Sequence, residues 1–313
     1  MVELFKWMQF SSEKMLFRFI RLLKFVWYHP LNKKDRLNAI WRVLSWQIVS
    51  RITPGPIAIP FVNGTYLLTT KGMNGSTGNW YCGLHEYEDM GFVLHVLQPG
   101  DLFVDVGANI GSYSILAGAC KGVKVIAIEP VPEPFLWLQK NIKVNKLDSK
   151  IESKNIGLAD QKSTLQFSSN LDTLNHVVSK KENNNSVISV DVDKLDNILN
   201  DKCPTVIKID VEGYEFQVLN GAKHILDNPN LLAVIIELNG SGIRYGIEDN
   251  QIHKLLISKE FEPFKYDPQI RKLISLKGKY RSTSNTLYIR KKNEVDLRIL
   301  KNTTHKLGTG QRI

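Results

Sequence analysis

The chain is poor in cysteine and lacks the spacings through which cysteine holds metals or staples small folds. Its three cysteines, Cys82, Cys120 and Cys203, are far apart, and neither a C-x-x-C pair nor a neighbouring histidine cluster accompanies them. Neither a disulfide framework nor a zinc site is therefore predicted. A reducing compartment is the simplest inference, and we expect a cytoplasmic protein.

A long uninterrupted apolar run is also absent. Residues 1–28 are rich in aromatic and aliphatic side chains, but charges at 13–14 and at Arg18, Arg21 and Lys24 interrupt them. This excludes a spanning helix, and no apolar core followed by small residues marks a cleaved signal. The segment predicts either a helix lying peripherally on the inner face of an anionic membrane or an arm packed on the catalytic domain or a second subunit. Packing on a second subunit would make the protein a homo-oligomer, and the sequence does not decide between these arrangements.

The two ends of the chain are short of acidic residues. Residues 1–51 hold ten Lys and Arg against three Asp and Glu, and residues 290–313 hold seven against two, whereas residues 52–289 are nearly neutral with 24 and 26. An enzyme that acts on nucleic acid is expected to carry its basic surface beside the active cleft. Nucleic acid is therefore not the predicted partner, although the net charge is +10.

The N-terminal third has two further patterns. Residues 35–51 place apolar residues at i, i+3, i+4 and i+7, which predicts a helix with one buried face. That face comprises Leu37, Ile40, Trp41, Leu44, Ile48 and Val49. Residues 52–84 are rich in glycine and proline around two short β-like runs, and they predict a hairpin and loops that form a lid over a ligand pocket.

The most informative segment is residues 101–114, which read D-L-F-V-D-V-G-A-N-I-G-S-Y-S. An apolar strand runs into a glycine-punctuated turn and then a helix start, where main-chain N–H groups face a ligand. The spacing D-x-G-x-N-x-G differs from the G-x-G-x-x-G of dinucleotide binders, and no Lys-Ser/Thr pair follows to hold phosphates. The next strand, 123–128, ends on Glu129, and an acid there can accept hydrogen bonds from ribose hydroxyls. Together these features predict an adenosine-bearing cofactor without a pyrophosphate.

Strand and helix patterns alternate from residue 85 onward, which is typical of a doubly wound α/β sheet. We expect helices at 86–97, 111–119, 132–145, 195–199, 214–226 and 249–259, and strands at 102–106, 123–128, 151–156, 164–168, 187–191, 205–210, 232–238, 261–266 and 285–290. Ligands bind such sheets at the carboxyl ends of the strands.

Four acids, Asp105, Glu129, Asp210 and Glu237, should converge at this edge of the sheet, although each could instead cap the helix that follows it. Lys208 is expected on the sheet face opposite Asp210, where a pairing role and a catalytic role both stay open.

At this point the chain resembles the FkbM-type S-adenosylmethionine-dependent methyltransferases. The resemblance covers roughly residues 80–240. It rests on P-G-D-L-F-V-D-V-G-A-N-I-G at 99–111, on I-A-I-E-P at 126–130 with Asn141 and Asn145 downstream, and on V-I-K-I-D-V-E-G-Y-E at 206–215 followed by V-L-N-G-A at 218–222. It implies a Rossmann-like seven-stranded class I methyltransferase sheet whose last strand is antiparallel. It also implies S-adenosylmethionine as cofactor and transfer of its methyl group to hydroxyl oxygens of sugars or natural products.

The resemblance and the strand-end positions define the candidate site residues. The predicted cofactor-binding residues are Glu88, Asp105, Gly107, Ala108, Asn109, Gly111, Ser112, Glu129, Pro130 and Asp210. A sugar hydroxyl is a poor nucleophile near neutral pH, so a general base or a divalent ion that lowers its pKa would help. The candidate catalytic residues are Asp210, Glu212, Glu237 and His85, followed by His176. His85 also fits a solvated surface residue, and the sequence establishes no metal site.

The predicted organisation is a basic aromatic extension (1–51), a hairpin and loop lid (52–84), the methyltransferase domain (85–290) and a basic tail (291–313). We expect an O-methyltransferase that acts on a hydroxyl of a sugar, glycan or glycolipid. Two alternatives stay open: a methyltransferase of another small molecule, and a noncatalytic adenosylmethionine-binding module in a membrane-associated assembly. The Asn/Asp-Pro-Pro-aromatic motif expected of nucleic-acid N-methyltransferases is absent after residue 209, where Asp-Val-Glu-Gly stands instead.

Overall fold

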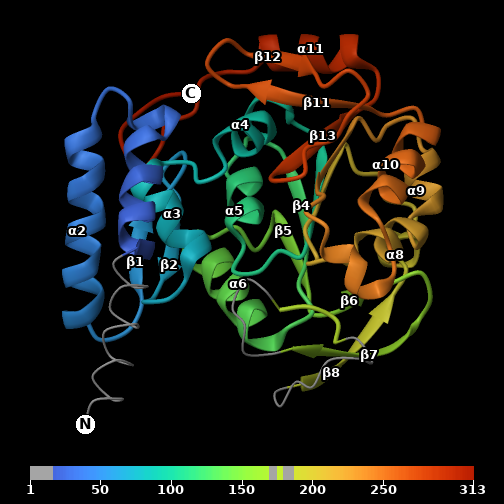
Figure 1. Cartoon of the computed structure of the whole chain (residues 1–313), viewed down its shortest axis with the longest axis horizontal. Coiled ribbons are helices and arrows are strands. Elements are labelled where there is room, and N and C mark those ends of the chain that lie inside the picture. Colours follow the sequence, from blue (N-terminus) through green and yellow to red (C-terminus); the bar gives the residue numbers. More distant parts are fainter. Residues whose placement is uncertain (1–16, 169–174, 179–186) are drawn as a thin grey trace.

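A computed structural model describes residues 17–168, 175–178 and 187–313. Its centre is an eight-stranded sheet in the order β12-β11-β13-β10-β9-β3-β4-β5 (Figure 1). Five neighbouring strands are parallel, and β13 runs antiparallel to both of its neighbours, β10 and β11. The strands are β3 (Leu102–Val106), β4 (Lys124–Ile128), β5 (Ile151–Lys154), β9 (Val206–Ile209), β10 (Ala233–Glu237), β11 (Glu262–Asp267), β12 (Lys272–Ser275) and β13 (Asn285–Ile289). This is the expected Rossmann-like sheet with an antiparallel last strand, β13, and it has β12 as an additional edge strand.

Helices cover both faces of this sheet, because the central strands are apolar on both sides. One face packs against α4 (Tyr87–Val96), α5 (Ser112–Gly118), α6 (Pro132–Val144) and α11 (Lys292–Lys301). The other face packs against α7 (Leu195–Leu199), α8 (Glu215–Asn220), α9 (Lys223–Asp227) and α10 (Asp249–Ser258). The alternation of Phe103 and Val104 in β3 shows the division, because each side chain belongs to a different core. The fold is therefore doubly wound.

Several elements differ from the sequence-based expectation. The strands expected at 164–168 and 187–191 form a separate three-stranded sheet, β6 (Gly157–Leu158), β8 (Val187–Asp193) and β7 (Ser163–Ser168). The helix expected at 214–226 is interrupted at Gly221, where a Cβ would lie 2.1 Å from the carbonyl oxygen of Ala159. The basic tail contains α11, whose Val295 and Ile299 are buried. Each of these features depends on contacts between segments that are far apart in the chain, so local sequence patterns did not reveal it.

The segment before the methyltransferase domain contains more helix than expected. Residues 17–28 are helical, and they are followed by η1 (Pro30–Asn32), α2 (Arg36–Ile52), the antiparallel hairpin of β1 (Ile57–Pro60) and β2 (Tyr66–Thr69), and α3 (Asn74–Cys82). The hairpin was expected, but α3 was not. Asn141 of α6 and Asn145 directly after it accept hydrogen bonds from the backbone N–H groups of Leu68 and Tyr66, both at 2.7 Å. These two asparagines therefore fasten the hairpin to the methyltransferase domain.

The C-terminal tail contacts the segment that precedes the methyltransferase domain. Leu307 forms an antiparallel bridge with Val62, next to the hairpin. The side chain of Gln311 donates a hydrogen bond of 2.7 Å to the carbonyl oxygen of Leu31, between the first two helices. The tail therefore holds the N-terminal helices and the hairpin in place.

The prediction of which face of α2 is buried is wrong. Ala39, Val43 and Trp46 pack inward, whereas the apolar residues expected to be buried point largely outward. The exposed fractions are 78% for Leu37, 64% for Trp41, 40% for Leu44, 59% for Ile48 and 38% for Val49, and Ile40 is partly buried. Periodicity locates an apolar face but does not say what covers it. In the described part of the chain, no helix is long and apolar enough to cross a membrane.

Candidate active site

A cavity of about 610 Å³ opens at the carboxyl ends of β3, β4 and β9. One wall is the edge of the sheet with its loops, from Asp105 to Asn109 and from Asp210 to Glu212. An apolar part of the lining comes from Ile128, Ile156, Leu158, Phe167 and Val177. The remaining wall comes from the N-terminal helices and α3, through Leu22, Phe25, Trp46, Gln47, Ser50 and Tyr81. Tyr81 belongs to the segment expected to form a lid, but no sequence pattern indicated that helix 17–28 and α2 reach the cavity, because their contacts are long-range.

The loop after β3 has the backbone that its glycines predicted. Gly107 (φ +76°) and Ala108 both donate backbone hydrogen bonds of 3.0 Å to the carbonyl oxygen of Ile128. A Cβ on Gly107 would lie 1.9 Å from the carbonyl oxygen of Asp210, so only glycine fits between the two strand ends. Gly111 is left-handed as well (φ +93°), and it begins α5. The loop thereby brings main-chain groups to the cavity.

Glu129 braces this loop from the end of β4. Its two carboxylate oxygens accept hydrogen bonds from the backbone N–H groups of Asn109 (2.8 Å) and Val131 (2.9 Å). Burial raises the pKa of Glu129 to about 7. Each oxygen keeps a second lone pair, so Glu129 can still accept from a ribose hydroxyl.

Asp105 presents an unsatisfied acceptor to the cavity. Its Oδ2 accepts a hydrogen bond of 2.6 Å from the Ser114 hydroxyl, whereas its buried Oδ1 has no partner among the described residues. Burial raises the pKa of Asp105, and the positive charge of Lys208 opposes that shift. A buried acceptor without a donor is costly. The ammonium group of a bound amino acid would satisfy it, so the residues present fit the methionine end of S-adenosylmethionine.

Lys208 lies on the same sheet face as Asp210, so the expected opposite orientation is wrong. Residues two apart in a strand share a face, and Lys208 Nζ lies 2.8 Å from Asp210 Oδ2. The ammonium also lies 4.8 Å from the centre of the Tyr113 ring. Burial alone would lower the pKa of Lys208, but the charges of Asp210 and Asp105 outweigh it and raise the pKa. Lys208 is therefore a permanent buried cation at the centre of the site.

The turn after Asp210 is strained and firmly held. Glu212 is left-handed (φ +54°) although it is not glycine, and Gly213 follows at φ +104°. Glu215 Oε1 accepts hydrogen bonds from the backbone N–H groups of Val211 (3.2 Å) and Gly213 (3.1 Å). Burial, together with the charges of Asp210 and Glu237, raises the pKa of Glu212 to about 7. Strain of this kind is common at functional sites.

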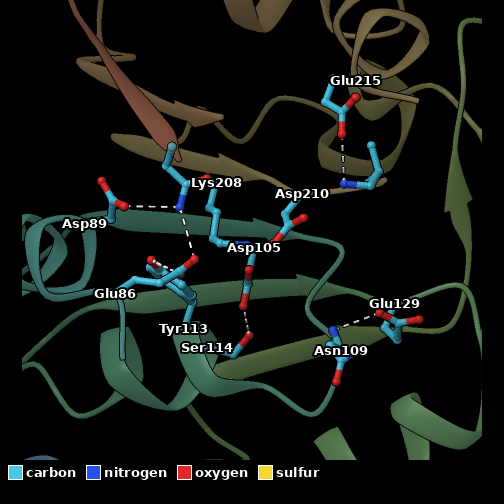
Figure 2. A network of polar contacts seen from close by, with 12 residues as sticks. Glu86, Asp89, Asp105, Asn109, Tyr113, Ser114, Glu129, Lys208, Asp210 and Glu215 are labelled. Carbon is cyan, nitrogen blue, oxygen red and sulfur yellow. Dashed lines mark hydrogen bonds and ion pairs between the residues drawn. The ribbon is translucent and has the colours of Figure 1, made fainter. Parts of the chain in front are cut away.

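A second acidic group lies on the floor of the cavity. Glu86 accepts a hydrogen bond of 2.6 Å from the Tyr113 hydroxyl and one of 3.4 Å from Asn285, and Asn285 also donates to Asp89 at 3.2 Å. Figure 2 shows Glu86 and Tyr113 close to Lys208 and Asp105. Burial raises the pKa of Asp89 to about 8. The sequence did not reveal that Tyr113 lines the cavity. Nor did it reveal the link from Asn285 to Glu86 and Asp89, because Asn285 is almost 200 residues away from both.

Most of the predicted site residues line this one cavity. They are His85, Asp105, Gly107, Ala108, Asn109, Ser112, Glu129, Pro130, Asp210 and Glu212. Four predicted residues lie outside the lining. Gly111 acts through the loop backbone, Glu237 ends β10, and Glu88 forms an ion pair with Arg281 at 2.6 Å. Burial raises the pKa of Glu237, and the nearby charge of Asp210 adds to the shift. His176 lies beside Ser168 and is not part of the lining either.

His85 is not the solvated surface residue that was the alternative interpretation. Its ring is packed edge-on against Phe25, with the ring centres 5.3 Å apart, and its Nδ1 is buried without a hydrogen-bond partner among the described residues. A Cβ on Gly78 would lie 2.2 Å from this nitrogen, so the small residue makes room for the ring. Burial lowers the pKa of His85, which keeps the imidazole neutral near pH 7.

Within the described ranges, no group of three or more His, Cys, Asp or Glu side chains is arranged to hold a metal ion. The sheet order, the glycine loop after β3 and the acid at the end of β4 define a Rossmann-like S-adenosylmethionine-dependent methyltransferase domain. The sequence model of the FkbM methyltransferase domain matches residues 105–278, more than half of the chain. The chain therefore belongs to the FkbM methyltransferase family, as its motifs indicated.

Two curated relatives and one solved structure show the range of similar proteins. The chain is 27% identical to the hexuronic acid methyltransferase AglP of Haloferax volcanii over 55% of this chain and 67% of AglP. It is 44% identical to the tRNA (guanine(37)-N(1))-methyltransferase of Danio rerio, but over only 20% of this chain and 13% of that enzyme. The crystal structure of the M. jannaschii tRNA m1G37 methyltransferase matches at a TM-score of 0.40 and 14% identity, over 75% of this chain and 53% of that one.

Proposed function

We propose that the protein is an S-adenosylmethionine-dependent O-methyltransferase that acts on a hydroxyl of a sugar or glycan. The observation that carries the proposal is the meeting of the glycine loop, Asp210 and Glu212 in one cavity. Family membership supports methyl transfer, and the similarity to AglP, which acts on a hexuronic acid, supports a sugar acceptor. The three free cysteines support a cytoplasmic location.

The cofactor fits the wall formed by the sheet edge. The ribose would be held by Glu129, the ammonium by Asp105 Oδ1, and the adenine by the apolar part of the lining. When bound, S-adenosylmethionine supplies a methyl carbon activated by its sulfonium. The enzyme's part is then mainly to align the acceptor hydroxyl and to remove its proton.

We infer that Glu212 takes this proton and that Asp210 orients the acceptor. A general base works best when its pKa lies near the operating pH, and the pKa of Glu212 is raised to about 7. Asp210 Oδ2 forms an ion pair with Lys208, and this contact fixes the direction of the other Asp210 carboxylate oxygen. The same assay on His85→Ala and Glu237→Gln ranks these two other candidates.

The test is transfer of a radiolabelled methyl group to uronic acids, neutral glycans, lipid-linked sugars and a tRNA transcript. We expect labelling of a sugar acceptor, with kcat/KM rising as the pH increases through about 7. Glu212→Gln should lower kcat/KM most at high pH and so flatten this rise, whereas Glu262→Gln, at an exposed position on β11, should leave activity unchanged. Labelling of the tRNA alone would overturn the acceptor class, and cofactor binding without any transfer would favour the noncatalytic alternative.

A further inference from the structure

The outer surface of the N-terminal helices carries a row of exposed large apolar side chains. On α2 they are Leu37, Trp41, Leu44, Ile48 and Ile52, which follow one another at three or four residues, the spacing of one helix face. Ile52 is 72% exposed, and Trp41 is 64% exposed. Helix 17–28, which precedes α2, carries two further exposed aromatic side chains, Phe17 and Tyr28, at 68% and 71%. We call this set of residues the outer apolar face, and Figure 1 shows α2 at the outermost edge of the molecule.

This face is separate from the packing that holds α2 in place. Val43 and Trp46 fill the core side, and the Arg42 guanidinium donates hydrogen bonds to Asn32 Oδ1 (3.0 Å) and to the carbonyl oxygen of Tyr81 (2.9 Å). The helix is therefore anchored without the outer apolar face. Exposed apolar residues gathered on one side usually mark an interaction surface.

The exposed charged residues of helix 17–28, of α2 and of the turn between them are all basic. Arg18, Arg21 and Lys24 on helix 17–28, and Lys33 and Lys34 before α2, are exposed. None of them forms a salt bridge with a carboxylate in the part of the chain that the structure describes.

The sole acidic residue in the described stretch 17–52 is Asp35, and its carboxylate accepts a hydrogen bond from the Asn38 side chain. A symmetric pairing of two copies through this face would bring these cations together, and like charges repel. An anionic lipid surface complements them.

We propose that helix 17–28 and α2 dock on an anionic membrane surface through the outer apolar face, with the surrounding Lys and Arg residues at the lipid head groups. Aromatic and aliphatic side chains enter the boundary between head groups and acyl chains, while basic side chains extend to the phosphates. Trp41 and Tyr28 are residue types that concentrate at this boundary. Docking of this kind needs no spanning helix.

The same two helices line the active-site cavity from inside. Leu22 and Phe25 of helix 17–28, and Trp46, Gln47 and Ser50 of α2, belong to its lining. Docking would therefore place this wall of the cavity beside the lipid. This consequence rests on the proposed function, because it suits an acceptor sugar carried by a lipid, whereas the docking itself does not depend on catalysis.

The test is co-sedimentation of the full chain with vesicles of phosphatidylcholine, alone or mixed with phosphatidylglycerol. We expect about tenfold stronger binding to the anionic vesicles, because several basic residues add their attractions, and a loss of that preference in high salt. The double variants Trp41→Ser/Ile48→Ser and Lys33→Glu/Lys34→Glu should each weaken binding about tenfold. The matched control is Leu297→Ser/Leu300→Ser on α11, at positions 57% and 65% exposed, and it should bind like the wild type.

Two further measurements make the result decisive. Calorimetry with S-adenosylhomocysteine shows whether each variant is folded, because a folded variant still binds this ligand. If the wild-type chain binds S-adenosylhomocysteine but no vesicles, the docking proposal is overturned and the proposed function is not. Sedimentation velocity reports the oligomeric state. A dimer that Trp41→Ser/Ile48→Ser dissociates would assign the face to a second copy of the chain. Equal binding to both vesicle types, or unchanged binding by both double variants, would also overturn the proposal.

Discussion

The carboxyl edge of the sheet and the N-terminal helices both supply walls to the same cavity. They differ in whether their charged side chains are buried and paired or exposed to solvent. At the sheet edge, Lys208 and Asp105 are buried and the cation is paired with Asp210. On the helices, Arg21 and Lys33 are exposed beside exposed apolar side chains, and neither has a carboxylate partner within the described ranges. Buried, paired charges hold a fixed geometry, as chemistry requires, whereas exposed charges of one sign attract a surface. This contrast is what the proposed function and the proposed membrane docking each require of one wall.

The largest effect that separates the two regions is expected at Asp210. Asp210→Asn should lower kcat by about 10²-fold or more, because it removes an acceptor-orienting carboxylate. It also removes the negative charge that lies 2.8 Å from the buried Lys208 ammonium, which destabilises the fold. The double variant Lys208→Met/Asp210→Asn should recover thermal stability but not methyl transfer. Recovery of both would show that Asp210 has only a structural role.

The next effect tests the loop after β3. Gly107→Ala places a methyl group where the Asp210 carbonyl oxygen lies 1.9 Å away, in addition to the strain of its positive φ. We expect a loss of about 2–4 kcal/mol of stability and at least tenfold weaker binding of S-adenosylhomocysteine. Gly246→Ala is the matched control, because Gly246 has nearly the same φ (+75°) and nothing within 4 Å of the added atom. Equal losses from both variants would mean that backbone strain alone matters.

The buried acids of the sheet edge predict a pH dependence that the exposed helices lack. Burial raises the pKa of Glu215 from its ordinary value of 4.5 to about 7, so the unfolded chain releases this proton first as the pH rises. Glu215 therefore lowers the free energy of unfolding progressively between about pH 4.5 and 7.

The variant Glu215→Gln can keep the two accepted backbone hydrogen bonds through its carbonyl oxygen while removing the charge. It should raise the free energy of unfolding at pH 8 by about 1–3 kcal/mol and change little at about pH 4. Urea unfolding at the two pH values measures this difference, with the exposed Glu262→Gln as control. A variant that is less stable than the wild type at pH 8 would contradict the assigned shift.

The smallest effect compares the two sides of α2. Val43 is fully buried and Ile48 is 59% exposed. We expect Val43→Ala to cost about 1–2.5 kcal/mol, because it leaves a cavity in the core, and Ile48→Ala to cost less than about 0.5 kcal/mol. Chemical denaturation of the two single variants measures both values. A large cost for Ile48→Ala would mean that the outer apolar face is needed for folding rather than for docking.

Local chemistry made some parts of the site predictable from the sequence. The glycine loop and the acids at strand ends follow from nearby residues, so the strand-helix pattern alone places Gly107, Glu129 and Asp210 at one edge of the sheet. The Asn285 link to Glu86 and Asp89 was not predictable in this way, because it joins α4 and its start to the last strand of the sheet.

The outer apolar face of α2 was misjudged for a related reason. The helical period identifies which residues share a face, but burial of that face depends on what the rest of the chain brings to it. The short edge strand β12 was missed because its four residues follow a tight turn at Arg271, which is left-handed.

The hydrogen bond from Gln311 to Leu31 joins residues 280 apart in the sequence. During synthesis on the ribosome, the helices that wall one side of the cavity emerge long before the segment that fastens them. While the sheet is being synthesised, these apolar and basic helices therefore lack the contact with the C-terminal tail. A membrane surface or a chaperone that receives these helices early would act on them before the pocket is assembled.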